Sequence, residues 1–110
     1  MNVELDVYSG RPNPQWTLSH DEARTLTDAL SNLQEVSDPP EPGLGYRGFI
    51  VSIPGASPRR VSIVNGFVSV GNPDGATRHY RDSAGLERRL IESAVAHGYA
   101  GLLQSLGVKT

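Results

Sequence analysis

Apolar and polar residues alternate in the first few positions of the chain. Val3, Leu5 and Val7 are separated by Glu4 and Asp6, and a period of two is typical of a strand with one buried face. Three further stretches, residues 49–53, 61–64 and 67–70, are rich in valine, isoleucine and phenylalanine, which favour strands. The pattern therefore predicts one strand near the start of the chain and three in its middle.

A tight turn joins the last two of these strands. Asn65 and Gly66 lie between them, and this pair predicts a two-residue type I′ hairpin, because both turn positions need positive φ. Such a turn pairs Val64 with Phe67 and gives the hairpin one entirely apolar face. That face consists of Val61, Ile63, Val68 and Val70, and the other carries Ser62, Val64, Phe67 and Ser69. We expect the apolar face to pack against helices.

Helical periodicity appears on both sides of these strands. Ser19 and Glu22 form a capping-box pattern, and apolar residues then recur every three or four positions as far as Leu33, which predicts a helix over residues 20–34. A second helix is expected to be capped by Asp82 or Ser83 and to end before Gly98. Its predicted buried side consists of Leu86, Leu90, Ile91, Ala94 and Val95. Residues 99–106 predict a short third helix.

The remaining segments connect these elements. Residues 36–45 are rich in proline and glycine and are predicted to form a rigid surface loop, while residues 77–81 predict a short edge strand. The order strand, helix, three or four strands, helix, short helix predicts a single α+β domain over residues 1–110. We expect a mainly antiparallel sheet of four to five strands with two main helices on one face. The first strand is expected to pair in parallel or at an edge.

Composition removes several classes of function. The chain has 110 residues, a formal net charge of −2 and no cysteine, so it offers no disulfide, zinc-thiolate site or cysteine nucleophile. Its charge balance argues against a duplex nucleic-acid partner, which needs a basic surface. No secretory signal or membrane-spanning stretch is seen. A small soluble cytoplasmic protein without a membrane partner is therefore expected.

The segment at residues 8–16 has the most unusual composition. It contains Arg11, Asn13 and the only tryptophan, Trp16, beside two prolines that stiffen the chain. Arginine and tryptophan are frequent anchors of binding interfaces, and a rigid loop loses little entropy on binding. The alternative is structural, with Trp16 in the core and Asn13 closing an Asx-turn.

Two other segments combine arginine with aromatic residues. Tyr46 and Arg47 lie within a G-x-G-x-x-G string at residues 43–48, which leads into a strand and so lacks the helix that a dinucleotide-binding loop requires. His79 and Tyr80 lie between two arginines. They are expected either to bind an anionic group or to form a solvated edge that prevents aggregation.

No convergent catalytic set can be named from the sequence. His20, His79 and His97 are far apart without ligand spacing, so neither a metal nor a cofactor is predicted. The preferred hypothesis is a non-catalytic module that recognises an anionic or peptide ligand, or a protein partner, through Arg11, Asn13, Trp16, Tyr46, Arg47, His79 and Tyr80. One alternative is a small enzyme using His79 with Arg11 or Arg47 on an anionic substrate. Another is an assembly subunit that buries its second sheet face in a homo-oligomer.

Overall fold

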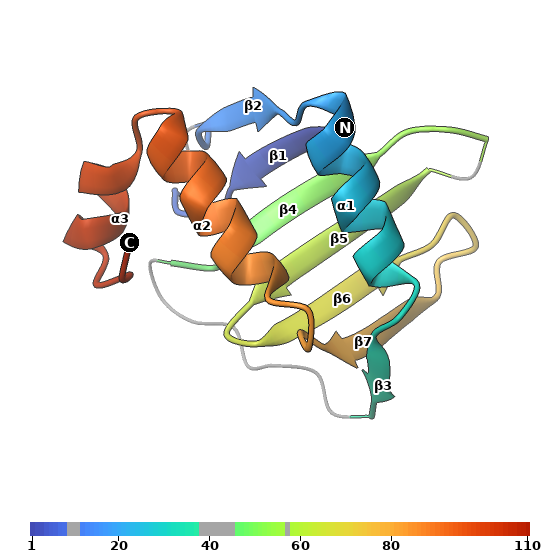
Figure 1. Ribbon diagram of the computed structural model, residues 1–110. Coiled ribbons are helices and arrows are strands. Elements are labelled where there is room, and N and C mark those ends of the chain that lie inside the picture. The colour runs from blue at the N-terminus through green and yellow to red at the C-terminus, as the bar shows by residue number, and fades with distance from the viewer. Residues whose placement is uncertain (9–11, 38–45, 57) are drawn as a thin grey trace.

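The computed structural model describes residues 1–8, 12–37, 46–56 and 58–110, and the strands within them form one antiparallel sheet (Figure 1). Its seven strands follow the order β2-β1-β4-β5-β6-β7-β3. They are β1 (Asn2–Leu5), β2 (Gln15–Thr17), β3 (Gln34–Val36), β4 (Phe49–Ile53), β5 (Arg59–Val64), β6 (Phe67–Gly71) and β7 (Thr77–Arg81). The α+β class is confirmed, whereas the expected four to five strands are too few.

Two helices, α1 (His20–Leu30) and α2 (Leu86–Ala96), lie across one face of this sheet, and α3 (Ala100–Ser105) follows α2 (Figure 1). The opposite surface, which we call the open face, carries the alternate side chains of the same strands. Glu4, Ser62, Ser69 and His79 belong to it, because cross-strand partners point to the same side. No helix among the described residues is long and apolar enough to cross a membrane.

The hairpin predicted at Asn65 and Gly66 is confirmed. Both residues have positive φ, 51° and 84°, and Val64 pairs with Phe67 as a two-residue turn requires. All four residues of the predicted apolar face are buried beneath the helices, while Ser62, Val64, Phe67 and Ser69 are half-buried on the open face. The turn therefore sets the register of the central strands.

The predicted capping box of α1 is also present. The Ser19 hydroxyl accepts from the Glu22 backbone, and the Glu22 carboxylate accepts from the Ser19 backbone. The helix nevertheless ends at Leu30 rather than residue 34, and Gln34–Val36 forms β3 beside β7. Apolar spacing continued to Leu33, but cross-strand pairing with β7 determines the conformation of the following residues.

Two strands occupy other positions in the sheet than expected, and two edge strands were not predicted. β1 is internal and antiparallel, because β2 pairs with it on one side and β4 on the other. β7 is a strand as predicted, but it is not an edge strand, because it pairs with β6 on one side and with β3 on the other. The edge strands β2 and β3 have three residues each, which is too short for an alternating pattern to be recognised in sequence.

The buried side of α2 was predicted correctly except at one position. Leu86, Leu90, Ile91 and Ala94 are buried, but Val95 is 39% exposed. Ser93 is buried instead, because it lies three residues after Leu90, on the stripe that faces the sheet. Hydropathy alone thus placed Val95 in the core, whereas the side chain that faces the core is that of the polar residue Ser93.

The N-cap of α2 lies later than expected, by three residues from Asp82 and by two from Ser83. Gly85 is its N-cap, with φ 68°, and Asp82 lies outside the helix. The Asp82 carboxylate still accepts from the backbone amides of Leu86 and Glu87, at 2.7 and 2.9 Å. Asp82 therefore performs the capping function from a preceding turn. At the other end Gly98 has φ 92°, as predicted for a glycine that ends a helix.

Candidate functional site

Asn13 holds the segment after β1 in place. Its side-chain oxygen accepts from the backbone amides of Val7 and Tyr8, at 3.0 and 2.7 Å, and its amide nitrogen donates to Glu4 at 2.8 Å. These bonds reach back to preceding residues and do not form the Asx-turn expected from the sequence. Arg11 lies outside the described residues, so the structure gives it no place relative to Asn13.

Arg47 reaches the same segment from the start of β4. One guanidinium nitrogen donates to Asp6 at 3.0 Å and to the Tyr8 carbonyl at 2.9 Å. The hydrogen bond to Asp6, together with its negative charge, raises the pKa of Arg47. Asn13 also approaches Asp6, at 3.4 Å. The structure thus brings Asn13 and Arg47 together around Asp6, where both have intramolecular partners.

Trp16 points into the core on the helix side of the sheet. Only 7% of its surface is exposed. Its indole nitrogen donates to the Ser93 hydroxyl at 2.9 Å, and its ring stacks on His97 and Tyr99 with centroids 5.4 and 5.5 Å away. This is the placement that the structural alternative described, and it leaves the indole little surface for a ligand.

Tyr46 belongs to a network that sequence reasoning missed. Its hydroxyl donates to the Glu87 carboxylate at 2.6 Å, and the same carboxylate accepts from the backbone amides of Asn65 and Gly66, at 3.1 and 3.2 Å. Burial, followed by the hydrogen bond and charge of Glu87, raises the pKa of Tyr46. Glu87 therefore ties α2 to the β5–β6 turn. The sequence signal was a lone acidic residue in the first turn of a helix, which is common.

His79 and Tyr80 point to opposite sides of β7. His79 lies on the open face, where its Nδ1 is 2.7 Å from the Ser69 hydroxyl, and Tyr80 packs against the core. Arg47 lies two residues before β4, and β7 lies three strand positions from β4, which is about 14 Å at the usual strand spacing. His79 and Arg47 are therefore not gathered at one site.

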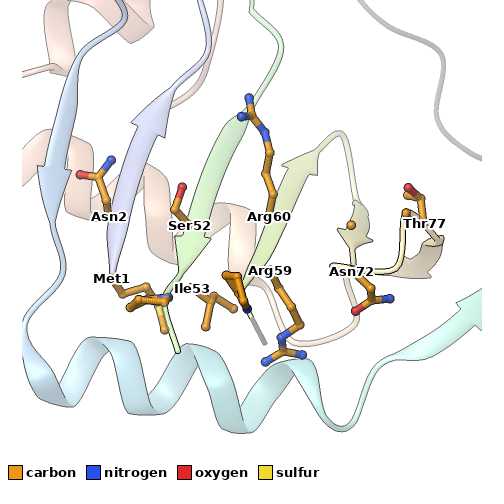
Figure 2. Close-up of a pocket in the computed structure, with 12 residues that line it drawn as sticks. Met1, Asn2, Ser52, Ile53, Arg59, Arg60, Asn72 and Thr77 are labelled. Carbon is orange, nitrogen blue, oxygen red and sulfur yellow. The ribbon is translucent and has the colours of Figure 1, made fainter. Parts of the chain in front are cut away.

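An open pocket of about 780 Å³ lies at the ends of the central strands. We call it the strand-end pocket (Figure 2). It is formed by the start of β1, the end of β4, the start of β5, the end of β6 and the start of β7. Its described lining is Met1, Asn2, Ser52, Ile53, Pro54, Pro58, Arg59, Arg60, Gly71, Asn72, Gly75 and Thr77. None of the binding residues predicted from the sequence is in this lining.

Two arginines dominate the electrostatics of this pocket. Arg59 points toward the helix layer and Arg60 toward the open face, as Figure 2 shows. Within the described part of the chain, neither guanidinium is ion-paired with a carboxylate, and the described lining contains no acidic residue. Gly71 pairs with Arg60 across the strands and carries no side chain, so Arg60 is unobstructed on that side.

Neutral hydrogen-bonding groups surround the two cations. Asn2 and Asn72 supply amides, and Ser52 and Thr77 supply hydroxyls. In the sequence itself, Arg59 and Arg60 are two adjacent arginines at the start of β5. Their acid-free surroundings come from five separate segments, which no local pattern brings together.

Neither metal-binding chemistry nor similarity to known proteins assigns a function to the described residues. In the portion of the chain with described coordinates, no three histidine, aspartate or glutamate side chains gather at a spacing that would hold a metal ion. A scan against models of protein families, a search of curated proteins and a search of solved structures each found no match for this chain. The strand-end pocket is therefore the feature of the described residues that bears on function.

Proposed function

We propose that the protein is a non-catalytic module that binds an anionic ligand in the strand-end pocket. The observation that carries this proposal is the pair Arg59 and Arg60, exposed to one pocket whose described lining has no carboxylate. A guanidinium stays charged at every physiological pH and matches the geometry of carboxylate and phosphate oxygens. In this pocket an anion is the partner that both side chains lack.

The orientation of the two arginines restricts the ligand. Consecutive strand residues point to opposite faces, so Arg59 and Arg60 approach the pocket from two sides of the sheet (Figure 2). A ligand that reaches both must lie across the strand ends and carry more than one anionic group. A diphosphate or an acidic peptide has this property, and the amides and hydroxyls of the lining supply neutral hydrogen bonds to it.

The lining favours binding over turnover. Its described residues include no histidine, aspartate or glutamate that would act as a general base toward Ser52 or Thr77. His79 lies on the same face but contacts Ser69. We therefore infer recognition without chemistry at this pocket.

Calorimetric titration with inorganic pyrophosphate tests the proposal. Arg59→Gln and Arg60→Gln should each weaken binding by about 10-fold or more, since a hydrogen bond to a charged group contributes about 1.5–3 kcal/mol. Arg89→Gln is the matched control, because Arg89 is an exposed arginine on α2 and its substitution changes the net charge equally. Binding by this control should equal that of the wild type.

Two results would refute the proposal. One is the absence of pyrophosphate binding and of acidic-peptide binding by the wild-type protein. The other is equal weakening by all three substitutions, which would show that only net charge matters. Circular dichroism of each variant establishes that the fold is retained.

A further inference from the structure

A row of residues crosses the open face at the strand-end pocket. Its five members are cross-strand partners, and all of them line the pocket: Asn2, Ser52, Arg60, Gly71 and Thr77. Neighbours in the row are one strand spacing apart, about 4.8 Å, and point to the same side of the sheet. Figure 2 shows Asn2, Ser52 and Arg60 along this row. The open-face half of the pocket is therefore an array of polar groups with one cation in its centre.

The neutral side chains of the pocket offer acceptors as well as donors. Ser52 and Thr77 carry hydroxyls and Asn72 carries an amide, and each of these groups both donates and accepts. Among the described residues, these three side chains make no hydrogen bond to another protein group. Phosphate and carboxylate oxygens are mainly acceptors at neutral pH, so they satisfy arginines but leave these side-chain oxygens without a donor. A ligand that matches the whole lining must therefore bring donors as well as negative charge.

Gly71 leaves a space in the row beside Arg60. The backbone does not require glycine there, because the φ of Gly71 lies outside the left-handed region that favours this residue. A Cβ at this position would lie 3.5 Å from the Arg60 carbonyl oxygen, which is an ordinary van der Waals distance. A larger side chain would instead occupy the pocket between Arg60 and Thr77. The missing side chain therefore gives room to a ligand rather than to the fold.

The strands at this pocket have no free edge for a peptide backbone. All five of them, β1, β4, β5, β6 and β7, are internal in the sheet, and neither edge strand contributes to the described lining. A peptide that binds by adding a strand needs an unpaired edge. An acidic peptide would therefore bind here through its carboxylates, which accept and do not donate. This disfavours an acidic peptide as the ligand.

We propose that the ligand of the strand-end pocket is a sugar that carries two phosphate groups. This inference rests on the proposed function, because it keeps Arg59 and Arg60 as the groups that bind the anions. Sugar hydroxyls both donate and accept, as do the side chains of Ser52, Asn72 and Thr77. The phosphates thus match the two guanidinium groups, and the sugar supplies the donors that inorganic pyrophosphate lacks.

The strand register orders the parts of this ligand. Arg60 pairs with Gly71, so the next residue, Asn72, lies at the level of Arg59. A sugar seated over Gly71 therefore has both arginines on its β5 side and Thr77 one strand spacing away on β7. Arg59 and Arg60 point to opposite sides of the sheet (Figure 2). Phosphate groups at the two ends of the sugar thus reach one guanidinium each.

Calorimetric titration with fructose 1,6-bisphosphate tests the inference. Hexane-1,6-diol bisphosphate is the matched ligand, because it has two phosphate groups and no free hydroxyl. The sugar bisphosphate should bind about 10-fold tighter or more, since it alone makes neutral hydrogen bonds to the lining. Both ligands and pyrophosphate are titrated at one pH and one ionic strength, so that the contribution of the charges is the same throughout.

Substitutions of the neutral lining separate the hydroxyls of the sugar from its phosphates. Thr77→Val removes one hydroxyl and keeps a β-branched side chain. It should weaken fructose 1,6-bisphosphate by about 3-fold or more and leave hexane-1,6-diol bisphosphate unchanged. Thr17→Val is the matched control, because Thr17 is an exposed strand threonine outside the described lining. This control should bind both ligands like the wild type.

Filling the space beside Arg60 is an independent test of where the sugar lies. Gly71→Val keeps both arginines and places a strand-favouring side chain in the pocket. It should weaken fructose 1,6-bisphosphate by about 10-fold or more, and pyrophosphate, which has no sugar to seat there, by much less. Circular dichroism checks that the variant folds, and Gly71→Ser, with its smaller side chain, replaces it if it does not.

The results distinguish this inference from the proposed function. If the wild-type protein binds pyrophosphate but binds the two bisphosphates equally, the sugar is not recognised and only the inference is wrong. Equal effects of Thr77→Val on both bisphosphates, or equal effects of Gly71→Val on fructose 1,6-bisphosphate and pyrophosphate, would overturn it as well. A protein that binds hexaglutamate and neither bisphosphate has a peptide site instead. A protein that binds none of these anions refutes both proposals.

Discussion

Removing the hydrogen bond between Trp16 and Ser93 tests whether the tryptophan has a structural role in the core. Ser93→Ala would remove the acceptor of the indole N–H, which lies 2.9 Å from the Ser93 hydroxyl in a region where both residues are at least 93% buried. Among the described residues, no other side chain accepts a hydrogen bond from the indole nitrogen. The indole N–H would therefore remain without a partner in the core.

The magnitude of this change follows from two opposing contributions. An unsatisfied buried donor costs about 1–3 kcal/mol, whereas alanine exceeds serine in helix propensity by about 0.5 kcal/mol. Ser93→Ala should therefore lower the free energy of unfolding by about 1–2 kcal/mol. Trp16→Phe also removes the donor, so the double variant should be less destabilised than the sum of the two single variants by about 1 kcal/mol.

Urea unfolding followed by circular dichroism measures all four members of this cycle. Tryptophan fluorescence adds a second probe for the variants that keep Trp16, which is the only tryptophan in the chain. Thr25→Ala is the control for helix propensity, because Thr25 is exposed on α1. An unchanged stability of Ser93→Ala, or strictly additive effects in the double variant, would refute the structural role argued for Trp16.

Three further predictions concern single contacts. The unfolded chain releases the Tyr46 proton near pH 10, whereas the folded chain retains it. Stability should therefore fall above about pH 10, by up to about 1.4 kcal/mol per pH unit, and Tyr46→Phe should reduce this slope in alkaline urea titrations. Gly48→Ala should lower the free energy of unfolding in urea by at least about 3 kcal/mol, because a Cβ there would overlap the β5 backbone. Gly107→Ala is the control, since Gly107 has the same φ of 80° but lies in open space. That substitution should lower the free energy of unfolding by about 1 kcal/mol. Asp82→Ala should lower the free energy of unfolding by about 1–2 kcal/mol, because two amides at the start of α2 lose their acceptor; an unchanged thermal midpoint would contradict this.

Features determined by neighbouring residues could be predicted from the sequence. The Ser19–Glu22 capping box and the Asn65–Gly66 turn each depend on fewer than five consecutive residues, and both are present in the structure. The register of the central hairpin follows from the turn alone. The buried stripe of α2 was predicted from periodicity, except where the hydrogen bond from Trp16 places Ser93 in the core.

Features determined by contacts between distant residues could not be predicted in this way. β2 pairs with β1 and β3 with β7, and the second pairing joins segments more than 40 residues apart. Glu87 is bound by groups from two other segments, although its own neighbours in sequence look like an ordinary exposed helix start. In each case the structural role of the residue depends on a partner that is distant in sequence, so the neighbouring residues do not reveal it.

The candidate site shows the same limit. Unusual composition directed attention to Trp16 and Asn13, whose side chains proved to have partners within the fold. Arg59 and Arg60 looked ordinary in sequence, because whether an arginine is ion-paired depends on the acidic residues that other strands place beside it. Since an ion pair satisfies a cation inside the molecule, the cations left without one are those available to a ligand. Among described residues, the search for a binding site should therefore begin from unmatched charge in the folded chain rather than from rare residue types.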